Sequence, residues 1–319
     1  SFYTSGMEKA SILVADGQGE DASATLAYGD KSGIKIIDTV PISSSPGYFY
    51  EAISDFIGLG LDSAGKTMGL APYGKPKYSF NTDTFKVSYI QGALDQQQQV
   101  VKRWKEQFVS MFGQPNIVKN IFRPVYGDTY KQISLNTLHK DIAASAQHTL
   151  ETMILKLVKQ LIIKTKEPNL CLAGGVALNC SSNTAIFKSG LVKDLFIPPV
   201  ANDAGVALGV AMLVGGIQSA NKLAHAYFGP GYSNTQIKSV LDKTGCRYKK
   251  VKDITSEVAG FLVKGKIVSW FQGRAEIGPR ALGSRSILAN PTISGIGAKV
   301  NKAKDRELWR PLAPSILEE

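Results

Sequence analysis

Residues 169–187 read NLCLAGGVALNCSSNTAIF, an apolar run that stops at Gly174 and Gly175 and is followed by residues of helical pattern. This order predicts a buried strand, a tight glycine turn and a helix. Residues 195–212, LFIPPVANDAGVALGVAM, repeat it with Asp203 at the turn. Two successive strand–turn–helix units predict an α/β fold. They also place backbone N–H groups at helix starts, where nucleotides are commonly bound.

The segments before residue 169 extend this α/β pattern. Residues 10–16 (ASILVAD), 23–29 (SATLAYG) and 33–40 (GIKIIDTV) alternate like strands between turn residues and predict a β-meander. Residues 48–57 predict a helix, and residues 140–164 carry apolar side chains at helical spacing, which predicts a long buried helix. The polar region between them, about 81–138, is expected to be a helical insertion or a lid.

A glycine-rich segment, residues 58–76, contains GLDSAGKT with the letters of a phosphate-binding loop at Gly60, Gly65, Lys66 and Thr67. We reject that loop because a helix is expected before it where a buried strand is required, and because MGLAPYG after it would break the required helix. Lys66 remains a candidate phosphate contact, and a surface lysine is the alternative.

The C-terminal part concentrates the positive charge of the chain. Between Lys264 and Arg310 there are ten basic and three acidic residues, or +7 of the net +11. Arg280 follows Gly-Pro and Arg285 follows Leu-Gly-Ser, so both lie at tight turns where guanidinium and N–H groups can converge on one anion. We expect the neighbouring Ala281, Leu282 and Ile287 to be core and the arginines to line a structured cleft. A solvated face is the alternative.

Composition limits the remaining possibilities. The 319 residues suffice for two domains, with the second beginning near residue 223, and no apolar run approaches the ~20 residues of a membrane-spanning helix. Three scattered cysteines favour a reducing compartment, so we expect a cytoplasmic protein. The first residue is Ser1 without a signal-peptide pattern, and we expect both ends to have been cut from a longer protein.

Six motifs in order give a family resemblance. They are GKTMGLAPYG (65–74), LAGGVALNCSSN (172–183), PVANDAGVALG (199–209), YFGPGYS (227–233), GRAEIGPRALGSRSILANP (273–291) and RELWRPLAPS (306–315). Together they resemble the O-carbamoyltransferases of nodulation-factor and antibiotic biosynthesis. The resemblance implies the later part of an actin- and sugar-kinase-like domain in residues 1–222. It implies part of a threonylcarbamoyladenylate-synthase-like domain in residues 223–319.

The resemblance implies a two-step reaction. Carbamoyl phosphate and ATP give carbamoyladenylate and pyrophosphate in the C-terminal domain, and the carbamoyl group then passes to a hydroxyl of a small-molecule acceptor at the actin-like domain. The acceptor would be a natural product or a saccharide. No nucleic-acid or membrane partner is expected.

Site residues follow from the matched motifs. Arg280, Arg285, Lys304 and Arg310 would hold the phosphate and carbamoyl groups, and Ser286 would add a hydroxyl donor. Gly174, Gly175 and Asn179 match the turn that contacts the nucleotide. Asp203 matches a metal ligand and Asp16 a second acidic residue near that metal, which would be Fe²⁺ or Mg²⁺.

Several alternatives stay open. Asp203 could cap the following helix, and Asp16 could be a turn residue. For Glu276, pairing with a neighbouring arginine is favoured over a role as general base. The two histidines that complete the metal site in the family would precede Ser1. The competing functions are a tRNA threonylcarbamoyl-modifying enzyme, which the GPRALGSRS motif opposes, and a non-catalytic nucleic-acid-binding protein.

Overall fold

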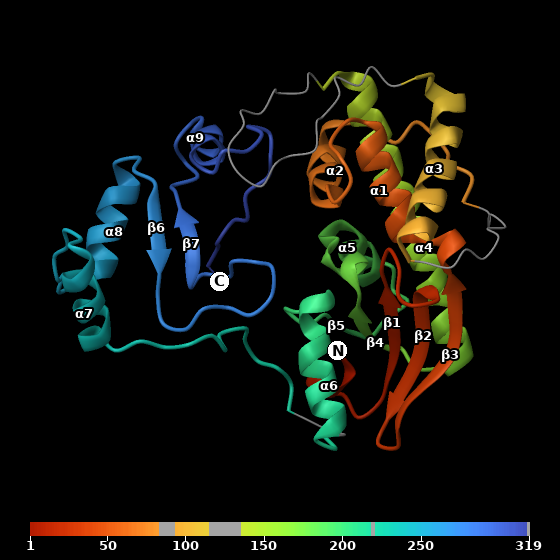
Figure 1. Cartoon of the computed structure of the whole chain (residues 1–319), viewed down its shortest axis with the longest axis horizontal. Coiled ribbons are helices and arrows are strands. Elements are labelled where there is room, and N and C mark those ends of the chain that lie inside the picture. The colour runs from red at the N-terminus through yellow and green to blue at the C-terminus, as the bar shows by residue number, and fades with distance from the viewer. Residues whose placement is uncertain (83–92, 115–134, 218–220, 318–319) are drawn as a thin grey trace. The chain divides into compact units, whose positions relative to one another are not determined.

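The computed structural model describes residues 1–82, 93–114, 135–217 and 221–317 (Figure 1). The chain divides into two compact units, Ser1–Leu223 and Ala224–Glu319, which we call unit 1 and unit 2. Each unit has its own sheet, and helices accompany both. The chain therefore has a mixed α/β fold.

Unit 1 is built on a five-stranded mixed sheet with the order β3-β2-β1-β4-β5. Its strands are β1 (Ala10–Ala15), β2 (Ala22–Asp30), β3 (Gly33–Pro41), β4 (Asn169–Ala173) and β5 (Asp194–Phe196). The first three form the predicted antiparallel meander, whereas β4 runs parallel to β1 and β5 parallel to β4. The carboxyl ends of β1, β4 and β5 consequently meet at one edge of the sheet.

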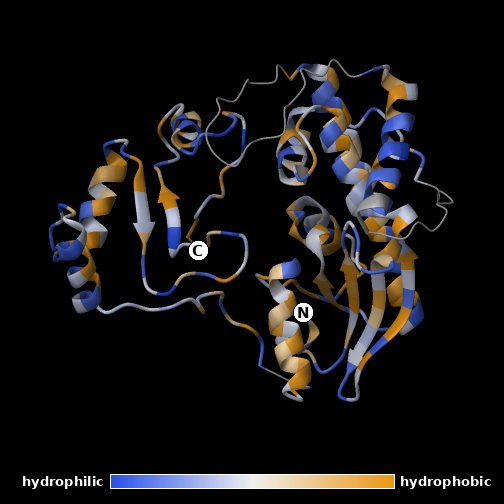
Figure 2. Ribbon diagram, viewed as in Figure 1, coloured by the Kyte–Doolittle hydropathy of each residue, from blue (hydrophilic) through white to orange (hydrophobic). Residues whose placement is uncertain are grey.

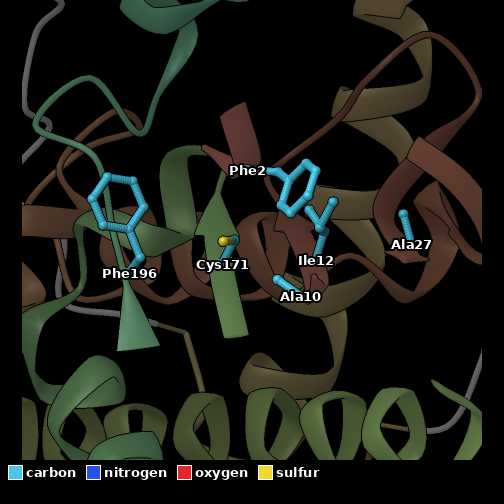
Figure 3. Close-up of a cluster of buried hydrophobic side chains, with 6 residues drawn as sticks. All are labelled: Phe2, Ala10, Ile12, Ala27, Cys171 and Phe196. Atoms are coloured by element: carbon cyan, nitrogen blue, oxygen red, sulfur yellow. The ribbon is translucent and has the colours of Figure 1, made fainter. Parts of the chain in front are cut away.

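The two faces of this sheet are covered differently, because successive side chains of a strand point to opposite faces. On one face, Ala10 and Ile12 of β1 pack with Phe2, Cys171 and Phe196 in a buried cluster (Figure 3). On the other face, the hydroxyl of Ser11 lies 2.7 Å from that of Thr165 at the end of helix α4. Helix α4 (Thr137–Thr165) therefore lies against β1 and confirms the predicted long helix.

The structure describes five further helices in unit 1. These helices are α1 (Pro46–Phe56), α2 (Ala64–Leu70), α3 (Ala93–Phe112), α5 (Cys180–Lys188) and α6 (Val206–Val214). The Ser45 side chain accepts the N–H of Tyr48 at 3.0 Å, and Pro46 occupies the first turn of α1, where no N–H donor is needed. The predicted helix at 48–57 is thereby confirmed.

Helix α3 accounts for part of the predicted insertion. Its Trp104 and Phe108 are fully buried and pack on Phe49 of α1, with ring centroids 5.0 and 6.2 Å from that of Phe49. This part of the segment belongs to the core of unit 1 and is not a lid. The rest of the expected insertion, residues 83–92 and 115–134, lies outside the described residues.

Helix α6 is hydrophobic along its length (Figure 2), yet most of its apolar side chains are exposed. The exposed ones are Val206, Leu208, Val210, Leu213 and Val214. Among the described residues, no helix is both long enough and apolar enough to cross a membrane.

Unit 2 contains a two-stranded antiparallel sheet and three helices. They are β6 (Val268–Phe271), β7 (Arg285–Leu288), α7 (Asn234–Thr244), α8 (Ile254–Val263) and α9 (Ile296–Ala303). Residues 226–229 lie alongside residues 275–277, because Gly229 donates its N–H to the carbonyl of Ala275 at 2.9 Å and Ile277 donates to Ala226 at 2.8 Å. These contacts bring the YFGPGYS motif next to the GRAEIGPRALGSRS loop.

Candidate functional site

The carboxylate of Asp16 lies at the edge of the unit 1 sheet, one residue after β1. Its Oδ2 accepts the backbone N–H of Gly175 at 2.7 Å, and its Oδ1 accepts the N–H of Gly17 at 2.7 Å. Asp16 is thus a turn residue in the chain, as the alternative interpretation proposed, and it also bridges two strands. The contact with Gly175 links Asp16 to the double-glycine turn, which the sequence had not indicated.

Gly174 explains why the turn after β4 requires glycine. Its φ is +89°, and a Cβ at this position would lie 2.1 Å from the carbonyl oxygen of Ala15. Its N–H donates to the carbonyl of Ala201 at 2.7 Å, which ties the loop after β5 to this turn. The N–H groups of Gly174 and Gly175 are therefore both engaged within the chain, although the sequence pattern suggested them as ligand donors.

Asn179 follows the turn and belongs to a buried polar network. Its Oδ1 accepts the N–H of Ser182 at 2.9 Å and caps α5, and its amide exchanges two hydrogen bonds with Gln147 of α4 at 3.0 and 3.1 Å. Gln147 Oε1 also accepts the hydroxyl of Tyr50 at 2.6 Å, and burial raises the pKa of this tyrosine. The network fixes α5 against α4 and α1 and gives Asn179 a structural role.

Asp203 and Lys66 lie on short helices of unit 1. Asp203 is exposed in the short 3-10 helix Asp203–Gly205, whose cap residue is Asn202, so Asp203 does not cap a helix by its side chain. Lys66 is half-buried on α2, which follows α1 with no strand between them. The rejection of a phosphate-binding loop at Gly60–Thr67 is confirmed by this order of elements.

The predicted metal ligands do not form a complete site by themselves. Within the part of the chain that the structure describes, no three His, Cys, Asp or Glu side chains come together in a metal-binding arrangement. Both oxygens of Asp16 already accept backbone N–H groups. Two carboxylates, one of them so engaged, are fewer than the four to eight ligands typical of protein-bound divalent cations.

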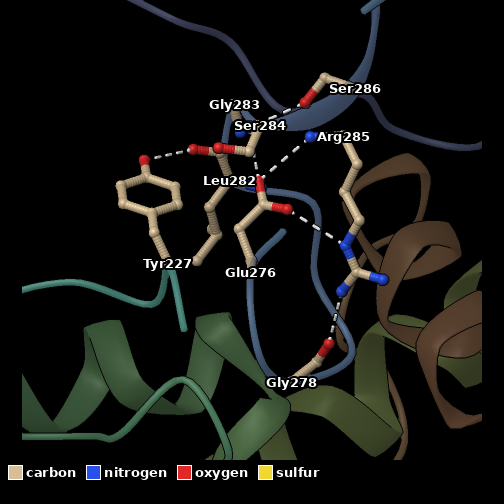
Figure 4. Close-up of polar contacts among 8 residues, drawn as sticks. All are labelled: Tyr227, Glu276, Gly278, Leu282, Gly283, Ser284, Arg285 and Ser286. Carbon is tan, nitrogen blue, oxygen red and sulfur yellow. Dashed lines mark hydrogen bonds and ion pairs between the residues drawn. The ribbon is translucent and has the colours of Figure 1, made fainter. Parts of the chain in front are cut away.

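In unit 2, a single carboxylate organises the GRAEIGPRALGSRS loop (Figure 4). Glu276 Oε1 accepts the backbone N–H groups of Leu282 at 2.8 Å and Ser284 at 2.6 Å, with a longer contact from Arg285 N–H at 3.4 Å. Its Oε2 accepts Nε of Arg285 at 3.1 Å. The predicted pairing of Glu276 with a neighbouring arginine is confirmed.

The ionised state of Glu276 follows from these donors. Burial alone would raise the pKa of this carboxyl, but the backbone N–H groups together outweigh burial and lower the pKa to about 2. Its side chain has no exposed surface. A carboxylate so weakly basic and so enclosed does not act as the general base considered from the sequence.

Arg285 and Ser286 are held by the same loop. Arg285 Nη2 donates to the carbonyl of Gly278 at 2.9 Å, while 44% of the side chain stays exposed. The Ser286 hydroxyl accepts the N–H of Gly283 at 3.2 Å, and Tyr227 donates its hydroxyl to the carbonyl of Leu282 at 3.0 Å. Arg285 therefore presents a fixed guanidinium group, and some of its N–H donors make no hydrogen bond to the part of the chain that the structure describes.

The other predicted cations differ in exposure. Arg280 is exposed beside Pro279, and Lys304 is exposed at the end of α9. Arg310 is mostly buried, and its Nη1 lies 3.4 Å from Glu307 Oε2. The structure joins Glu276, Arg285 and Ser286 by hydrogen bonds around one loop. Within the described residues, no hydrogen bond or ion pair between side chains joins these three to Arg280, Lys304 or Arg310.

The expected apolar lining of an arginine cleft is wrong. Leu282 is 49% exposed and Ile287 39% exposed, and Ala281 is exposed as well. The loop is held by hydrogen bonds to Glu276 instead of by packing of these side chains, so their apolar character was a poor guide to burial.

Sequence reasoning missed Asn301, which organises the RELWRP segment. Asn301 is 1% exposed; its Nδ2 donates to the carbonyls of Leu308 at 2.9 Å and Arg310 at 2.8 Å, and its Oδ1 accepts Nε of Arg306 at 2.6 Å. Burial lowers the pKa of Arg306, and the nearby Arg310 lowers it further. The sequence offered one signal, an asparagine in the last turn of α9, close to the RELWRP segment.

Comparison with known proteins gives matches along the chain. Residues 1–212 match the model of the carbamoyltransferase N-terminus, and residues 259–319 match that of the carbamoyltransferase C-terminus. Nodulation protein NolNO of Sinorhizobium fredii is 36% identical over 327 residues, covering 100% of this chain and 46% of the relative.

Two further relatives are also nodulation proteins. NolO of Bradyrhizobium diazoefficiens is 34% identical over 329 residues, covering 100% of this chain and 57% of the relative. Nodulation protein U of Azorhizobium caulinodans is 34% identical over 184 residues, covering 56% of this chain and 32% of the relative. The chain thus spans about half the length of the first curated relatives that it matches.

Proposed function

This chain belongs to the carbamoyltransferase family, and on that premise we propose that the protein transfers a carbamoyl group to a hydroxyl of a small-molecule acceptor. The acceptor would be a natural product or a saccharide. The observation that carries the proposal is the family match over residues 1–212 together with the match over residues 259–319.

We assign formation of the activated carbamoyl group to unit 2. Water hydrolyses carbamoyl phosphate to carbamate and phosphate. A carbamate oxygen then attacks the α-phosphorus of ATP, and the bond between that phosphorus and the departing pyrophosphate breaks to give carbamoyladenylate. Negative charge grows on the departing pyrophosphate, so fixed cations stabilise the transition state. Arg285, held by Glu276 and still 44% exposed, supports this role, and Arg280, Lys304 and Arg310 would add charge.

We assign carbamoyl transfer to unit 1, where the acceptor oxygen attacks the carbamoyl carbon and AMP leaves. The sheet edge that carries Asp16, Gly174 and Gly175 is the usual place for ligands in an open α/β sheet. The mixed sheet order supports an actin-like origin for this unit, and the second unit would be threonylcarbamoyladenylate-synthase-like. Asp203 and Asp16 would contribute to a metal site with ligands from outside the described residues.

Release of pyrophosphate from ATP tests the first step. We expect release by the natural full-length protein only when carbamoyl phosphate is present, and loss of release in Arg280→Ala. Lys249→Ala is the matched control because Lys249 is an exposed cation of the same unit, paired with Glu257. Release that needs threonine and bicarbonate instead, or equal effects of the two substitutions, would contradict the proposal.

A variant that loses only carbamoyl transfer tests the assignment of the two steps to different units. We expect Asp203→Ala to leave pyrophosphate release unchanged and to stop transfer to the acceptor, because the two steps are assigned to different units. Loss of both steps in Asp203→Ala would contradict this assignment.

A further inference from the structure

We propose that Glu276 is a positioning residue, a built-in anion that shapes the 282–285 loop and aims the guanidinium of Arg285 at a phosphate group of the ligand. The proposal rests on the proposed function, since it specifies how unit 2 would bind the phosphates of its substrates. It adds a residue that does not contact the substrate itself but determines where the guanidinium of Arg285 contacts it.

The 282–285 loop resembles a backbone site that binds an anion, and the anion bound there is the carboxylate of Glu276. The N–H groups of Leu282 and Ser284 donate to Glu276 Oε1 at 2.8 and 2.6 Å, with a longer contact from the Arg285 N–H at 3.4 Å. Arg285 Nε donates to Oε2 at 3.1 Å. Successive N–H groups that converge in this way usually bind anions. Glu276 therefore takes the place of an external anion inside the loop and holds the loop in shape.

The same contacts use some of the N–H donors of the Arg285 guanidinium and leave the others available. Nε donates to Glu276 and one N–H of Nη2 donates to Gly278, so the inner edge is fixed by two bonds. A guanidinium carries five N–H donors, which leaves three of them, and 44% of the side chain is exposed. These remaining donors form a rigid fork of the kind that binds phosphate oxygens.

Burial of Glu276 keeps its carboxylate in place within the loop. The Glu276 side chain has no exposed surface, so a ligand phosphate cannot displace it without opening the loop. Removal of the carboxylate would leave the N–H donors of the loop and the inner edge of the guanidinium without their acceptor, and loss of its charge alone would weaken these hydrogen bonds, which is costly at a buried site. A phosphate ligand is consequently expected on the outer face of Arg285, with Glu276 behind it.

A double-mutant cycle on pyrophosphate affinity tests the proposal. Inorganic pyrophosphate is titrated by calorimetry into the natural full-length protein, Glu276→Gln, Arg285→Ala and the double variant. We expect each single variant to bind about tenfold or more weakly, the range of a lost charge-assisted hydrogen bond. The double variant should bind no more weakly than Arg285→Ala, because Glu276 acts through Arg285.

Controls separate this role from a general loss of structure. Glu257→Gln removes another carboxylate of unit 2 that pairs with a lysine, and it should leave pyrophosphate affinity unchanged. If Glu276→Gln does not fold, Glu276→Asp is used in its place, and Arg285→Lys is used in place of Arg285→Ala. Glu276→Asp should then bind pyrophosphate more tightly than any Arg285 variant, because it keeps the carboxylate. The proposal would be overturned if Glu276→Gln weakened pyrophosphate binding by the same factor with and without Arg285→Ala. It would also be overturned if Glu276→Gln left pyrophosphate affinity unchanged.

The outcome distinguishes this proposal from the proposed function. A wild-type protein that binds pyrophosphate and shows the expected coupling, yet releases no pyrophosphate from ATP and carbamoyl phosphate, contradicts the proposed reaction and keeps Glu276 as a positioning residue. A wild-type protein that does not bind pyrophosphate overturns the positioning role.

Discussion

Asp16 and Gly175 are joined across two parallel strands by a hydrogen bond of 2.7 Å from the Gly175 N–H to Asp16 Oδ2. The two residues are 159 positions apart in the sequence and lie at the ends of β1 and β4. A Cβ on residue 175 would lie 2.8 Å from Asp16 Oδ1, so the absence of a side chain lets the carboxylate approach the backbone. The pair therefore fixes the sheet edge on which the proposed transfer step depends.

Removal of the Asp16 carboxylate should destabilise unit 1. Asp16→Ala leaves the N–H groups of Gly17 and Gly175 without their acceptor, which costs about 1–3 kcal/mol of unfolding free energy for a buried donor. Asp16→Asn keeps one acceptor oxygen and should lose less. Urea unfolding measures both, with the exposed Asp21→Ala as control; equal losses in Asp16→Ala and Asp21→Ala would contradict the role of the pair.

The turn after β4 should not tolerate a side chain at residue 174. Gly174→Ala forces a φ of +89° on an alanine, a strain of about 1–3 kcal/mol, and it places the Cβ 2.1 Å from the Ala15 carbonyl oxygen. Gly209→Ala is the matched control: it lies in α6 with open space around the position and should gain up to about 1 kcal/mol of helix stability. Thermal unfolding compares them, and similar midpoints would show that the turn adapts.

Local patterns predicted the elements of the sheet edge well. The meander at residues 10–40, the helix at 140–164 and the glycine turn at 174 each depend on periodicity or on a backbone conformation that only certain residues adopt. The pairing of Glu276 with a neighbouring arginine was predicted as well, and the structure identifies that arginine as Arg285.

The features that sequence reasoning missed depend on contacts between distant parts or on burial of a polar group. Nothing local to Asn301 shows that it is 1% exposed, since this depends on the loop that packs over it. The apolar letters of Leu282 and Ile287 suggested core, but hydrogen bonds to Glu276 determine the path of that loop. Internal use of the Gly175 N–H likewise depends on a carboxylate from another strand.

Truncation of Asn301 should loosen the RELWRP segment. Asn301→Ala removes the acceptor of Arg306 Nε and the donor to the carbonyls of Leu308 and Arg310. We expect faster amide hydrogen exchange over residues 306–310, because local stability depends on such buried hydrogen bonds. Asn290→Ala is the control, since its side chain accepts hydrogen bonds from the nearby Thr292 and lies outside the segment measured. Unchanged exchange in Asn301→Ala would show that packing alone holds the segment.

The stability of unit 2 should depend on acid through Glu276. Its pKa in the folded chain is about 2, below the ordinary 4.5, so the unfolded chain binds the proton more tightly. The stabilisation is therefore fully present above pH about 4.5 and is lost as the pH falls toward about 2. Other carboxylates of the unit, such as Asp242 and Asp253, have lowered pKa values and respond to acid in the same direction.

Comparison with Glu276→Gln isolates the contribution of this one carboxyl. The variant has no proton to gain at residue 276, so its unfolding free energy should be lower than that of the wild type at neutral pH and should fall less steeply in acid. The difference between the two proteins should shrink steadily as the pH falls from about 4.5 to about 2. Chemical unfolding at several pH values measures that difference, and a difference that does not change with pH would mean that Glu276 is not held as a buried anion.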